Sequence, residues 1–457
     1  MTCTNDTIAA IATPAAAGGI GIVRISGAFA IETAEKIFRP VRQTKLTASK
    51  GYRAYFGNAT DGDEVLDEAV CLVFRAPHSY TGEDVAEISC HGGMYITGRV
   101  LQAAITAGAR IAEPGEFTKR AFLNGKMDLS EAEAVMSMVG AQGEQAAKAA
   151  MTALDGALSR KIRAVADGVI GAAAGIAAWT DYPDEDIEAV HTENLYATLQ
   201  SAKQELTALL ERFDAGQAVT EGVDTVIVGR PNVGKSTLMN LLSGTEKSIV
   251  THIPGTTRDI VEQTVRLGNL VLHLSDTAGI RETENPVEQI GVERAKQKLE
   301  RAVLVLAVFD GSTALTDEDR QLLESCKDRL SVAVLNKEDQ GTAVDAEALR
   351  RYIPEVVQIS AKDGSGYDAL CAAVTKLLGT DSFDPSAAML ANSRQKDCCT
   401  RAVQCLAEAL DAIDCGMTLD AVNVCADGCI NALLELTGEK ASEVVVSEVF
   451  SRFCVGK

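Results

Sequence analysis

Apolar residues in the first part of the chain occur in short, β-branched runs separated by turn residues. The runs predicted as strands lie at residues 21–25, 69–74 and 85–89. Residues 28–38 and 98–107 carry apolar side chains at helical spacing. Together these segments predict a compact α/β domain over residues 1–122.

A helical pattern follows this domain. Residues 129–178 are rich in Ala, Glu, Gln and Met with almost no proline, which favours one long helical region. An acidic run at 181–186 interrupts it, and a second helix is predicted at 192–217. Helical patterning returns after residue 385 and continues nearly to the end. The sequence therefore predicts a helical domain in two parts, residues 123–221 and 384–457.

The period of the apolar positions changes between the two helical parts. Residues 224–378 alternate short β-branched runs with helices, which is typical of a parallel sheet with crossover helices. Strands are predicted at 226–228, 271–274, 303–308, 332–335 and 356–359. We therefore expect an α/β cassette over residues 222–383, inserted into the helical domain.

Composition is that of a soluble globular protein, with 457 residues of which 46% are hydrophobic and 23% charged. The longest purely apolar run, residues 302–309, has the length of a strand and is far short of a membrane span. The N-terminus shows no basic region followed by an apolar core. We expect a cytoplasmic protein with no membrane association.

The formal net charge is −21, which bears on binding partners. Such a chain does not attract nucleic acid through its overall charge. Any contact with RNA therefore needs a local basic patch or a second protein.

The 12 cysteines contain no paired CxxC element and are expected to be reduced thiols packed as small hydrophobic groups. Five widely separated histidines indicate no zinc site. Cys454 is an exception because it lies three residues from the end of the chain. Either it has a redox or reactive role, or the C-terminus is held in a pocket for structural reasons.

Residues 229–237, with the sequence GRPNVGKST, carry a phosphate-binding motif between a predicted strand and a predicted helix. Glycines in such a loop let backbone N–H groups turn toward phosphates at the positive end of the helix. Lys235 would reach the β- and γ-phosphates, and the Ser236 hydroxyl would bind Mg²⁺.

Three further motifs follow in order: DTAG at 276–279, NKED at 336–339 and SAK at 360–362. Asp276 can hold magnesium through water, and the Gly279 N–H can sense the γ-phosphate. The Asp339 carboxylate can accept both the ring N–H and the exocyclic amine of guanine, which adenine does not offer. The motifs predict a site for GTP whose binding residues are Asn232, Val233, Gly234, Lys235, Ser236, Thr237, Asp276, Thr277, Ala278, Gly279, Asn336, Lys337, Asp339, Ser360, Ala361 and Lys362.

The group that assists hydrolysis is not the usual one. Ile280 stands where small regulatory GTPases have a water-orienting Gln. Asn232, together with residues 251–259, could offer oxygen atoms to a monovalent cation, and K⁺ beside the phosphates would act as an arginine finger does. The alternative is that Asn232 only caps the turn of the loop, and the residues leave both interpretations open.

Segments along the whole chain carry a resemblance to one family. They are residues 18–27 (GGIGIVRISG), 80–87 (YTGEDVAE), 91–93 (HGG), 114–118 (PGEFT), 121–129 (AFLNGKMDL), 181–185 (DYPDE), 255–259 (GTTRD) and 453–457 (FCVGK). From residue 5 to residue 457 the chain resembles the bacterial tRNA modification GTPases, which alter the wobble uridine together with a flavin-dependent partner. The resemblance implies a multidomain fold: an N-terminal α/β folate-binding domain and an all-α domain interrupted by a P-loop G domain with a Ras-like parallel sheet.

For the G domain the resemblance implies face-to-face dimerisation with K⁺ and GTP, which accelerates hydrolysis. The implied K⁺ ligands are Asn232, Thr251, Ile253 and Thr256. Thr251, Thr256 and Thr257 join the predicted GTP-binding residues, and Thr257 joins Ser236 at Mg²⁺. The catalytic carboxylate, acting through water beside Lys235, maps to Glu288. On composition alone, Glu288 would be interpreted as a solvated helix residue.

For the N-terminal domain the resemblance implies a constitutive homodimer and a site for 5-formyltetrahydrofolate or a related one-carbon tetrahydrofolate. The implied folate contacts are Arg24, Glu87, Lys126 and Lys457. Basic groups suit the glutamate carboxylates of folate, and a carboxylate suits the amino edge of the pterin. The partner would complete a heterotetramer and hold most of the tRNA.

Two other classes of function stay open at the level of sequence. The chain could be a GTP-gated docking module in ribosome or RNA assembly. It could also be a helical interaction scaffold in which GTP is structural and is never hydrolysed.

Overall fold

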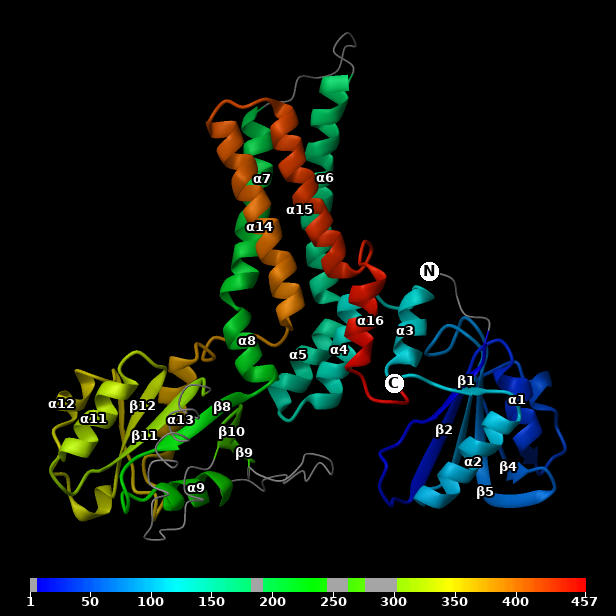
Figure 1. The fold of residues 1–457 in the computed structure, drawn as a ribbon, viewed down its shortest axis with the longest axis horizontal. Coiled ribbons are helices and arrows are strands. Elements are labelled where there is room, and N and C mark those ends of the chain that lie inside the picture. The colour runs from blue at the N-terminus through cyan, green and yellow to red at the C-terminus, as the bar shows by residue number, and fades with distance from the viewer. Residues whose placement is uncertain (1–5, 182–191, 245–261, 276–301) are drawn as a thin grey trace, which may run out of the picture. The chain divides into compact units, whose positions relative to one another are not determined.

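The computed structural model describes residues 6–181, 192–244, 262–275 and 302–457 (Figure 1). Contacts within the chain divide it into two compact units. The first comprises Met1–Met136, Leu154–Lys203 and Asp397–Lys457, and the second comprises Ser137–Ala153 and Gln204–Lys396. Each unit is described below by itself.

The first unit contains a seven-stranded sheet of order β3-β4-β5-β6-β2-β1-β7. Its strands are β1 (Ile8–Ile11), β2 (Ile20–Ser26), β3 (Phe38–Pro40), β4 (Arg53–Asp61), β5 (Glu64–Phe74), β6 (Val85–His91) and β7 (Arg110–Ile111). All neighbours pair antiparallel except β1 and β7. The three predicted strands are confirmed as β2, β5 and β6, whereas β1, β3, β4 and β7 were not predicted.

Helices α1 (Ala30–Ile37) and α2 (Met94–Thr106) cover one face of this sheet (Figure 1). Alternate residues of the strands, among them Val23, Cys71 and Ile88, join the helices in one buried core. The residues between them point to the other face, because side chains alternate along a strand. That face includes Phe56 and Val70, which oppose each other across β4 and β5 and are exposed.

The helices of the helical part are α4 (Leu129–Gly140), α5 (Glu144–Leu154), α6 (Ala157–Asp181), α7 (Thr192–Glu211), α8 (Phe213–Thr220), α14 (Ser393–Asp414), α15 (Leu419–Thr437) and α16 (Glu443–Ser451). The prediction of one helical run over 129–178 is too coarse, because three helices fill that range. Gly156, at φ +75°, separates α5 from α6, since a left-handed residue ends a helix. Helices α6 and α15 pack against each other (Figure 1).

One helix in the described part of the chain, α6 over Ala157–Trp179, is long and apolar enough to cross a membrane by length and composition. About a third of that segment is buried within the structure. A single helix of this kind is weak evidence for a span, because core helices of soluble proteins have the same composition.

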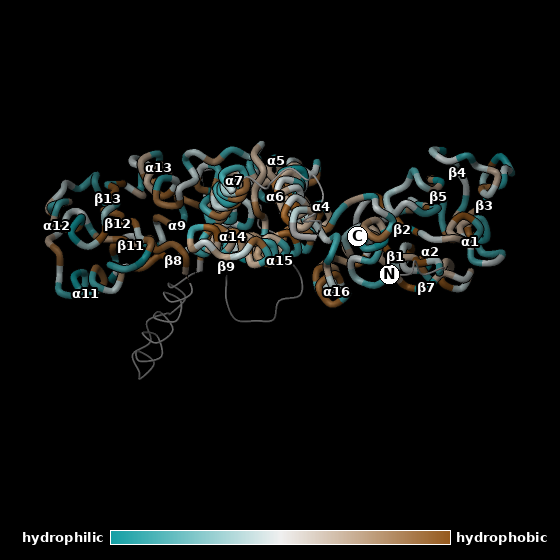
Figure 2. Tube along the Cα trace, turned by 90° about the horizontal axis from the view of Figure 1, so that it is seen from above, coloured by the Kyte–Doolittle hydropathy of each residue, from teal (hydrophilic) through white to brown (hydrophobic). Residues whose placement is uncertain are grey.

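The C-terminus packs against the N-terminal part of the first unit. Helix α16 is a hydrophobic stretch (Figure 2), and its Phe450 contacts the rings of Phe122 and Phe453 at centroid distances of 6.2 and 5.2 Å. These rings form a buried cluster with Leu129 at the start of α4. Gly115, at φ +68° before α3 (Glu116–Leu123), lies so close that a Cβ there would be 2.5 Å from the Phe450 carbonyl oxygen.

The second unit contains a six-stranded sheet of order β13-β12-β11-β8-β10-β9. Its strands are β8 (Val223–Val228), β9 (Glu262–Leu267), β10 (Leu270–Ser275), β11 (Leu304–Asp310), β12 (Ser331–Asn336) and β13 (Glu355–Gln358). The described helices around it are α9 (Lys235–Gly244), α11 (Asp317–Cys326), α12 (Ala346–Arg350) and α13 (Tyr367–Leu377). Residues of β8 alternate between two hydrophobic clusters, so both faces of the sheet are covered.

The predicted parallel sheet has one antiparallel strand, at its edge. Strand β9 pairs antiparallel with β10 through a two-residue turn at Gly268 and Asn269, whereas the other neighbours are parallel. Gly268 has φ +61°, which suits a tight hairpin turn. The predicted fold class is otherwise confirmed: an α/β part, a helical part and an α/β cassette inserted between its two halves.

We predict that Phe450→Ala lowers the free energy of unfolding by about 3 kcal/mol, because it removes a buried ring and leaves a cavity between Phe122 and Phe453. Unfolding in urea measures the effect. Val444→Ala on the same helix is the control, since Val444 is 76% exposed; we expect a change within about 0.5 kcal/mol. Equal effects of the two substitutions would contradict the prediction.

Candidate functional site

The phosphate-binding loop lies between β8 and α9. Strand β8 ends at Val228 and helix α9 begins at Lys235, so the motif has the strand–loop–helix context that the sequence predicted. Gly234 has φ +97°, and a Cβ there would lie 2.2 Å from Asn336 Nδ2. Only glycine fits that position, because any side chain would collide with the neighbouring motif.

Lys235 is held across the loop that precedes it. Its Nζ donates hydrogen bonds to the carbonyl oxygens of Gly229 at 2.7 Å and Arg230 at 2.8 Å. Burial lowers the pKa of this ammonium group. The next two residues, Ser236 and Thr237, are exposed on the first turn of α9, where a hydroxyl can reach a metal ion bound to phosphates.

Asn336 joins three of the predicted motifs through one side chain. Its Nδ2 donates to the Val233 carbonyl oxygen at 2.9 Å, and its Oδ1 accepts from the Ala361 N–H at 2.9 Å. Asn336 is 3% exposed, so these bonds are protected from water. The phosphate loop, the NKED motif and the SAK motif are therefore held in one arrangement.

The guanine-recognition motifs lie at the ends of neighbouring parallel strands. Strand β12 ends at Asn336, β13 ends at Gln358, and the Glu338 N–H donates to the Ile359 carbonyl oxygen at 3.1 Å. Asp339 and Lys362 are exposed, whereas Ser360 and Ala361 are buried. The Asp339 carboxylate is therefore accessible to a base, while the buried Ser360 and Ala361 hold the loop in place.

Lys337 connects this motif to β11. It has φ +69°, and its Nζ forms an ion pair with Asp310 Oδ2 at 2.6 Å. Burial opposes the ionisation of Asp310, but hydrogen bonds from Lys337 and Ser312 outweigh it and hold the pKa of that carboxyl below its usual value. Asp310 belongs to none of the predicted motifs, and only its place at the end of a buried strand could have indicated a role.

Several predicted residues lie outside the described part of the chain. These are Thr251, Ile253, Thr256, Thr257, Asp276, Thr277, Ala278, Gly279 and Glu288, as well as Ile280. Strand β10, which precedes residue 276, pairs directly with β8, so the DTAG motif follows the strand next to the phosphate loop.

A second group of predicted residues meets in the first unit. Arg24 Nε forms an ion pair with Glu87 Oε1 at 2.7 Å, and Arg24 Nη1 donates to the Gly456 carbonyl oxygen at 3.2 Å. Both side chains are less than a fifth exposed. The Phe117 N–H donates to the Lys457 carbonyl oxygen at 3.2 Å. Three of the four residues implied as folate contacts therefore lie together.

Two aromatic residues complete this group, and the sequence analysis gave them no role. The Arg24 guanidinium lies 5.3 Å from the ring centroid of Tyr80 and 5.5 Å from that of Phe117. Tyr80 Oη is 2.8 Å from Thr118 Oγ1, and burial raises the pKa of the phenol. Their only sequence signal is that both lie in segments that carry the family resemblance.

The fourth implied contact, Lys126, contacts the segment that contains Tyr80. The Lys126 Nζ donates to the Pro77 carbonyl oxygen at 3.1 Å. Its Cγ packs against Gly82, where an added Cβ would lie 3.3 Å from it. The side chain is exposed.

Cys454 has an exposed side chain on a bound backbone. Its carbonyl oxygen accepts from the Gly115 N–H at 3.4 Å and the Lys457 N–H at 3.3 Å, while Phe453 and Gly456 on either side are buried. The backbone of the C-terminus is thus held in place by hydrogen bonds. A structural role of this segment was one of the two interpretations that the sequence left open for Cys454. The described cysteines form no disulfide.

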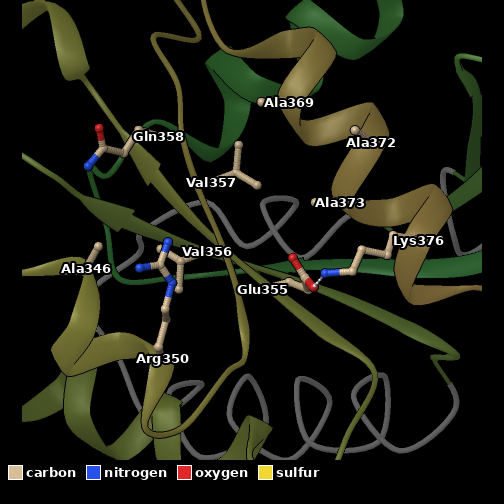
Figure 3. A pocket seen from close by; sticks show the side chains of 10 residues that line it. All are labelled: Ala346, Arg350, Glu355, Val356, Val357, Gln358, Ala369, Ala372, Ala373 and Lys376. Carbon is tan, nitrogen blue, oxygen red and sulfur yellow. Dashed lines mark hydrogen bonds and ion pairs between the residues drawn. The ribbon is translucent and has the colours of Figure 1, made fainter.

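A pocket of about 620 Å³ lies beside β13, between α12 and α13 (Figure 3). Glu355 and Lys376 in its lining form an ion pair of 2.6 Å, and alanines of α13 line one wall. None of the predicted GTP-binding residues lines this pocket. It is therefore separate from the nucleotide motifs.

A P-loop joined by Asn336 to a guanine-recognition motif defines a GTPase of the P-loop class. Family models match nearly the whole chain: the "MnmE helical domain" over residues 129–454 and the "GTP-binding protein TrmE N-terminus" over residues 7–126. The chain belongs to the MnmE family of GTPases.

The sequences of two relatives align with this chain over nearly their full lengths. The tRNA modification GTPase MnmE of Symbiobacterium thermophilum is 44% identical over 99% of this chain and 100% of its own. That of Acetivibrio thermocellus is 41% identical over 99% of each chain. Among solved structures, the G domain of the T. maritima FeoB iron transporter aligns with 34% of this chain and 98% of its own at 25% identity, with a TM-score of 0.27 that is too low to bear on the fold.

We predict that Asn336→Ala weakens GDP binding at least about tenfold, because two buried hydrogen bonds are lost and each leaves a backbone group unpaired. Equilibrium titration with a fluorescent GDP measures the affinity. Gln340→Ala, an exposed substitution four residues further on, is expected to bind within about twofold of the unmodified protein. Unchanged affinity in a folded Asn336→Ala protein would show that the amide does not organise the site.

Proposed function

We propose that this protein is a GTPase that is activated by K⁺ when two G domains associate, and that it acts with a flavin-dependent partner to modify the wobble uridine of tRNA. The observation that carries the proposal is the joining of the phosphate loop to the guanine-recognition motifs through Asn336. Membership of a family whose named relatives are tRNA modification GTPases supports the choice of substrate.

The conformation of Asn232 supports the potassium interpretation. Asn232 has φ +64° and an exposed side chain. An amide oxygen at this point is available to a cation beside the β- and γ-phosphates, where positive charge stabilises the transition state.

The remaining chemistry rests on residues outside the described part of the chain. We propose Thr251, Ile253 and Thr256 as the other K⁺ ligands, Thr257 with Ser236 at Mg²⁺, and Glu288 as the carboxylate that orients water. A Glu can polarise a water molecule where Ile280 cannot. The exposed Ser236 hydroxyl on the first turn of α9 is consistent with this assignment.

The uncovered face of the N-terminal sheet supports a constitutive homodimer. Phe56 is 58% exposed and lies opposite Val70, while α1 and α2 occupy the other face of the sheet. Exposed apolar patches of this kind mark protein interfaces. Arg24 and Glu87 point to the same side of the sheet, where Phe117 and the C-terminal residues already cover them.

We propose that this polar group binds 5-formyltetrahydrofolate or a related one-carbon tetrahydrofolate. Arg24, Lys126 and Lys457 can pair with the glutamate carboxylates, and Glu87 can accept from the amino edge of a pterin. The rings of Tyr80 and Phe117 beside Arg24 offer flat apolar surface to a planar heterocycle. Cys454, exposed beside this group, is proposed as a reactive or redox thiol.

The net charge of −21 favours an arrangement in which the partner, and not this chain, binds most of the tRNA. An acidic chain does not attract tRNA through its overall charge, so the flavin-dependent partner would hold most of the RNA in a heterotetramer. We place the assembly in the cytoplasm, without a membrane. A GTP-gated docking module for ribosome or RNA assembly is the competing function, and it requires no folate.

GTP turnover in KCl and in NaCl tests the first half of the proposal. We predict that K⁺ accelerates turnover roughly a hundredfold over Na⁺, because a fixed cation stabilises charge that develops in the transition state. Asn232→Ala should lose most of this acceleration. Glu288→Ala should bind nucleotide normally and hydrolyse little of it. If turnover is equal in the two salts, the potassium proposal is wrong.

Calorimetric titration with 5-formyltetrahydrofolate tests the second half. We predict binding by the full chain and a loss of about tenfold or more in Arg24→Ala, since a charge-assisted contact is removed. Arg39→Ala is the matched control, because Arg39 pairs with the exposed Asp63 away from this group. An absence of binding to the unmodified chain would favour the docking module instead.

A further inference from the structure

Residues 310–319, which run from the last residue of β11 into the first turn of α11, contact two motifs of the nucleotide site. At the start of this segment, Asp310 holds Lys337 of the guanine-recognition motif through the 2.6 Å ion pair described above. Asp310 Oδ1 also accepts from the Ser312 N–H at 3.0 Å and hydroxyl at 2.6 Å, which fixes the carboxylate. One end of the segment is therefore attached to the base-binding side.

The other end of the segment is attached to the phosphate loop through Arg230. Arg230 Nη2 donates to Thr313 Oγ1 at 2.8 Å, and Arg230 Nε lies 3.4 Å from Asp319 Oδ2. The Asp319 side chain is only 2% exposed, and that of Arg230 is 25% exposed. The phosphate loop and helix α11 are thus joined by an ion pair that is largely screened from water.

Asp319 has a second role that explains why it is buried. Its Oδ2 accepts from the Thr316 N–H at 2.9 Å and its own N–H donates to Thr316 Oγ1 at 3.3 Å, which together form the capping box at the start of α11. The Thr316 hydroxyl also donates to Asp319 Oδ2 at 2.8 Å. Asp319 Oδ1 is buried and has no hydrogen-bond partner in the described structure, and neither has Arg230 Nε. A carboxylate in this environment is costly without a nearby cation. The guanidinium of Arg230 supplies that cation.

The position of Arg230 in the loop gives the ion pair a consequence for the nucleotide. The Arg230 carbonyl oxygen accepts from Lys235 Nζ at 2.8 Å, and Asn232 follows two residues later in a left-handed conformation. Pro231 between them has a fixed φ, which removes one of the backbone rotations that separate Arg230 from Asn232. Holding the Arg230 side chain therefore restrains the backbone that faces the phosphates.

We propose that Arg230 and Asp319 are positioning residues for GTP binding and hydrolysis: their ion pair sets the conformation of the phosphate loop, and residues 310–319 couple that loop to Lys337 on the guanine side. Neither side chain needs to touch the nucleotide. Substitution of Asp319 on α11 is then expected to weaken nucleotide binding, although this helix carries none of the GTP-binding motifs.

The test is a double-mutant cycle with Arg230→Gln, Asp319→Asn and the two together. Asn at 319 keeps the volume and one acceptor for Thr316, so the helix cap is retained while the charge is removed. We expect each single variant to release a fluorescent GDP about tenfold faster, and the double variant to release it no faster than the singles. In steady state the Michaelis constant for GTP should rise more than the turnover number falls.

Asp317→Asn on the same helix is the matched control, because it removes an exposed pair with Arg320 that does not reach the loop. GDP release from this variant should stay within about twofold of the unmodified protein. Thermal unfolding is followed in parallel, since a purely structural role would lower the unfolding midpoint without changing GDP release below it. Unchanged release, or effects that add in the double variant, would overturn the proposal. If Asp319→Asn does not fold, Arg230→Gln against Asp317→Asn decides the question alone.

Discussion

The hydrogen bonds of one buried amide organise the nucleotide-binding part of this protein. Asn336 lies at the end of a central strand and binds the backbone of the phosphate loop at Val233 and of the SAK motif at Ala361. Because an amide has both a donor and an acceptor, one side chain can bind a carbonyl oxygen of one loop and an N–H group of the other. Gly234 must be a glycine for the same reason, since any Cβ would displace that amide.

Charged pairs add a second layer of restraint around this amide. Lys337 binds Asp310, and Arg230 binds Asp319, so the motif that contains Asn336 and the phosphate loop are both also attached to residues 310–319. Buried ion pairs contribute little net stability, but removal of one partner leaves an uncompensated charge. Their value here is geometric, because they limit how far the two loops can move apart.

The first unit depends on contacts between the two ends of the chain. Arg24 on β2 binds the carbonyl oxygen of Gly456, and Phe117 binds that of Lys457. The buried ring of Phe450 supports this contact from α16. A site formed in this way exists only when the final helix has packed, so folding of the helical part and assembly of the polar group are linked.

Local sequence predicted much of the fold, because apolar periodicity is a local property. Strands β2, β5 and β6 and the five strands predicted in the cassette are rich in β-branched residues and were found. Strands β1, β3 and β7 have two to four residues, too few for a period to show. β9 was missed although it pairs with a predicted strand, because polar residues interrupt its apolar pattern. The break at Gly156 within the helical run was also not anticipated.

The sequence by itself determined the identity of the nucleotide, since each motif is a short contiguous run: the phosphate loop lies between a strand and the next helix, and the guanine-recognition residues directly follow strands. It also determined the family, through segments spread along its whole length. Only the tertiary structure decided what holds those motifs together. The partners of Asn336, Arg230 and Arg24 lie 25 to 432 positions away in the sequence, and such contacts are made by folding rather than by local preference.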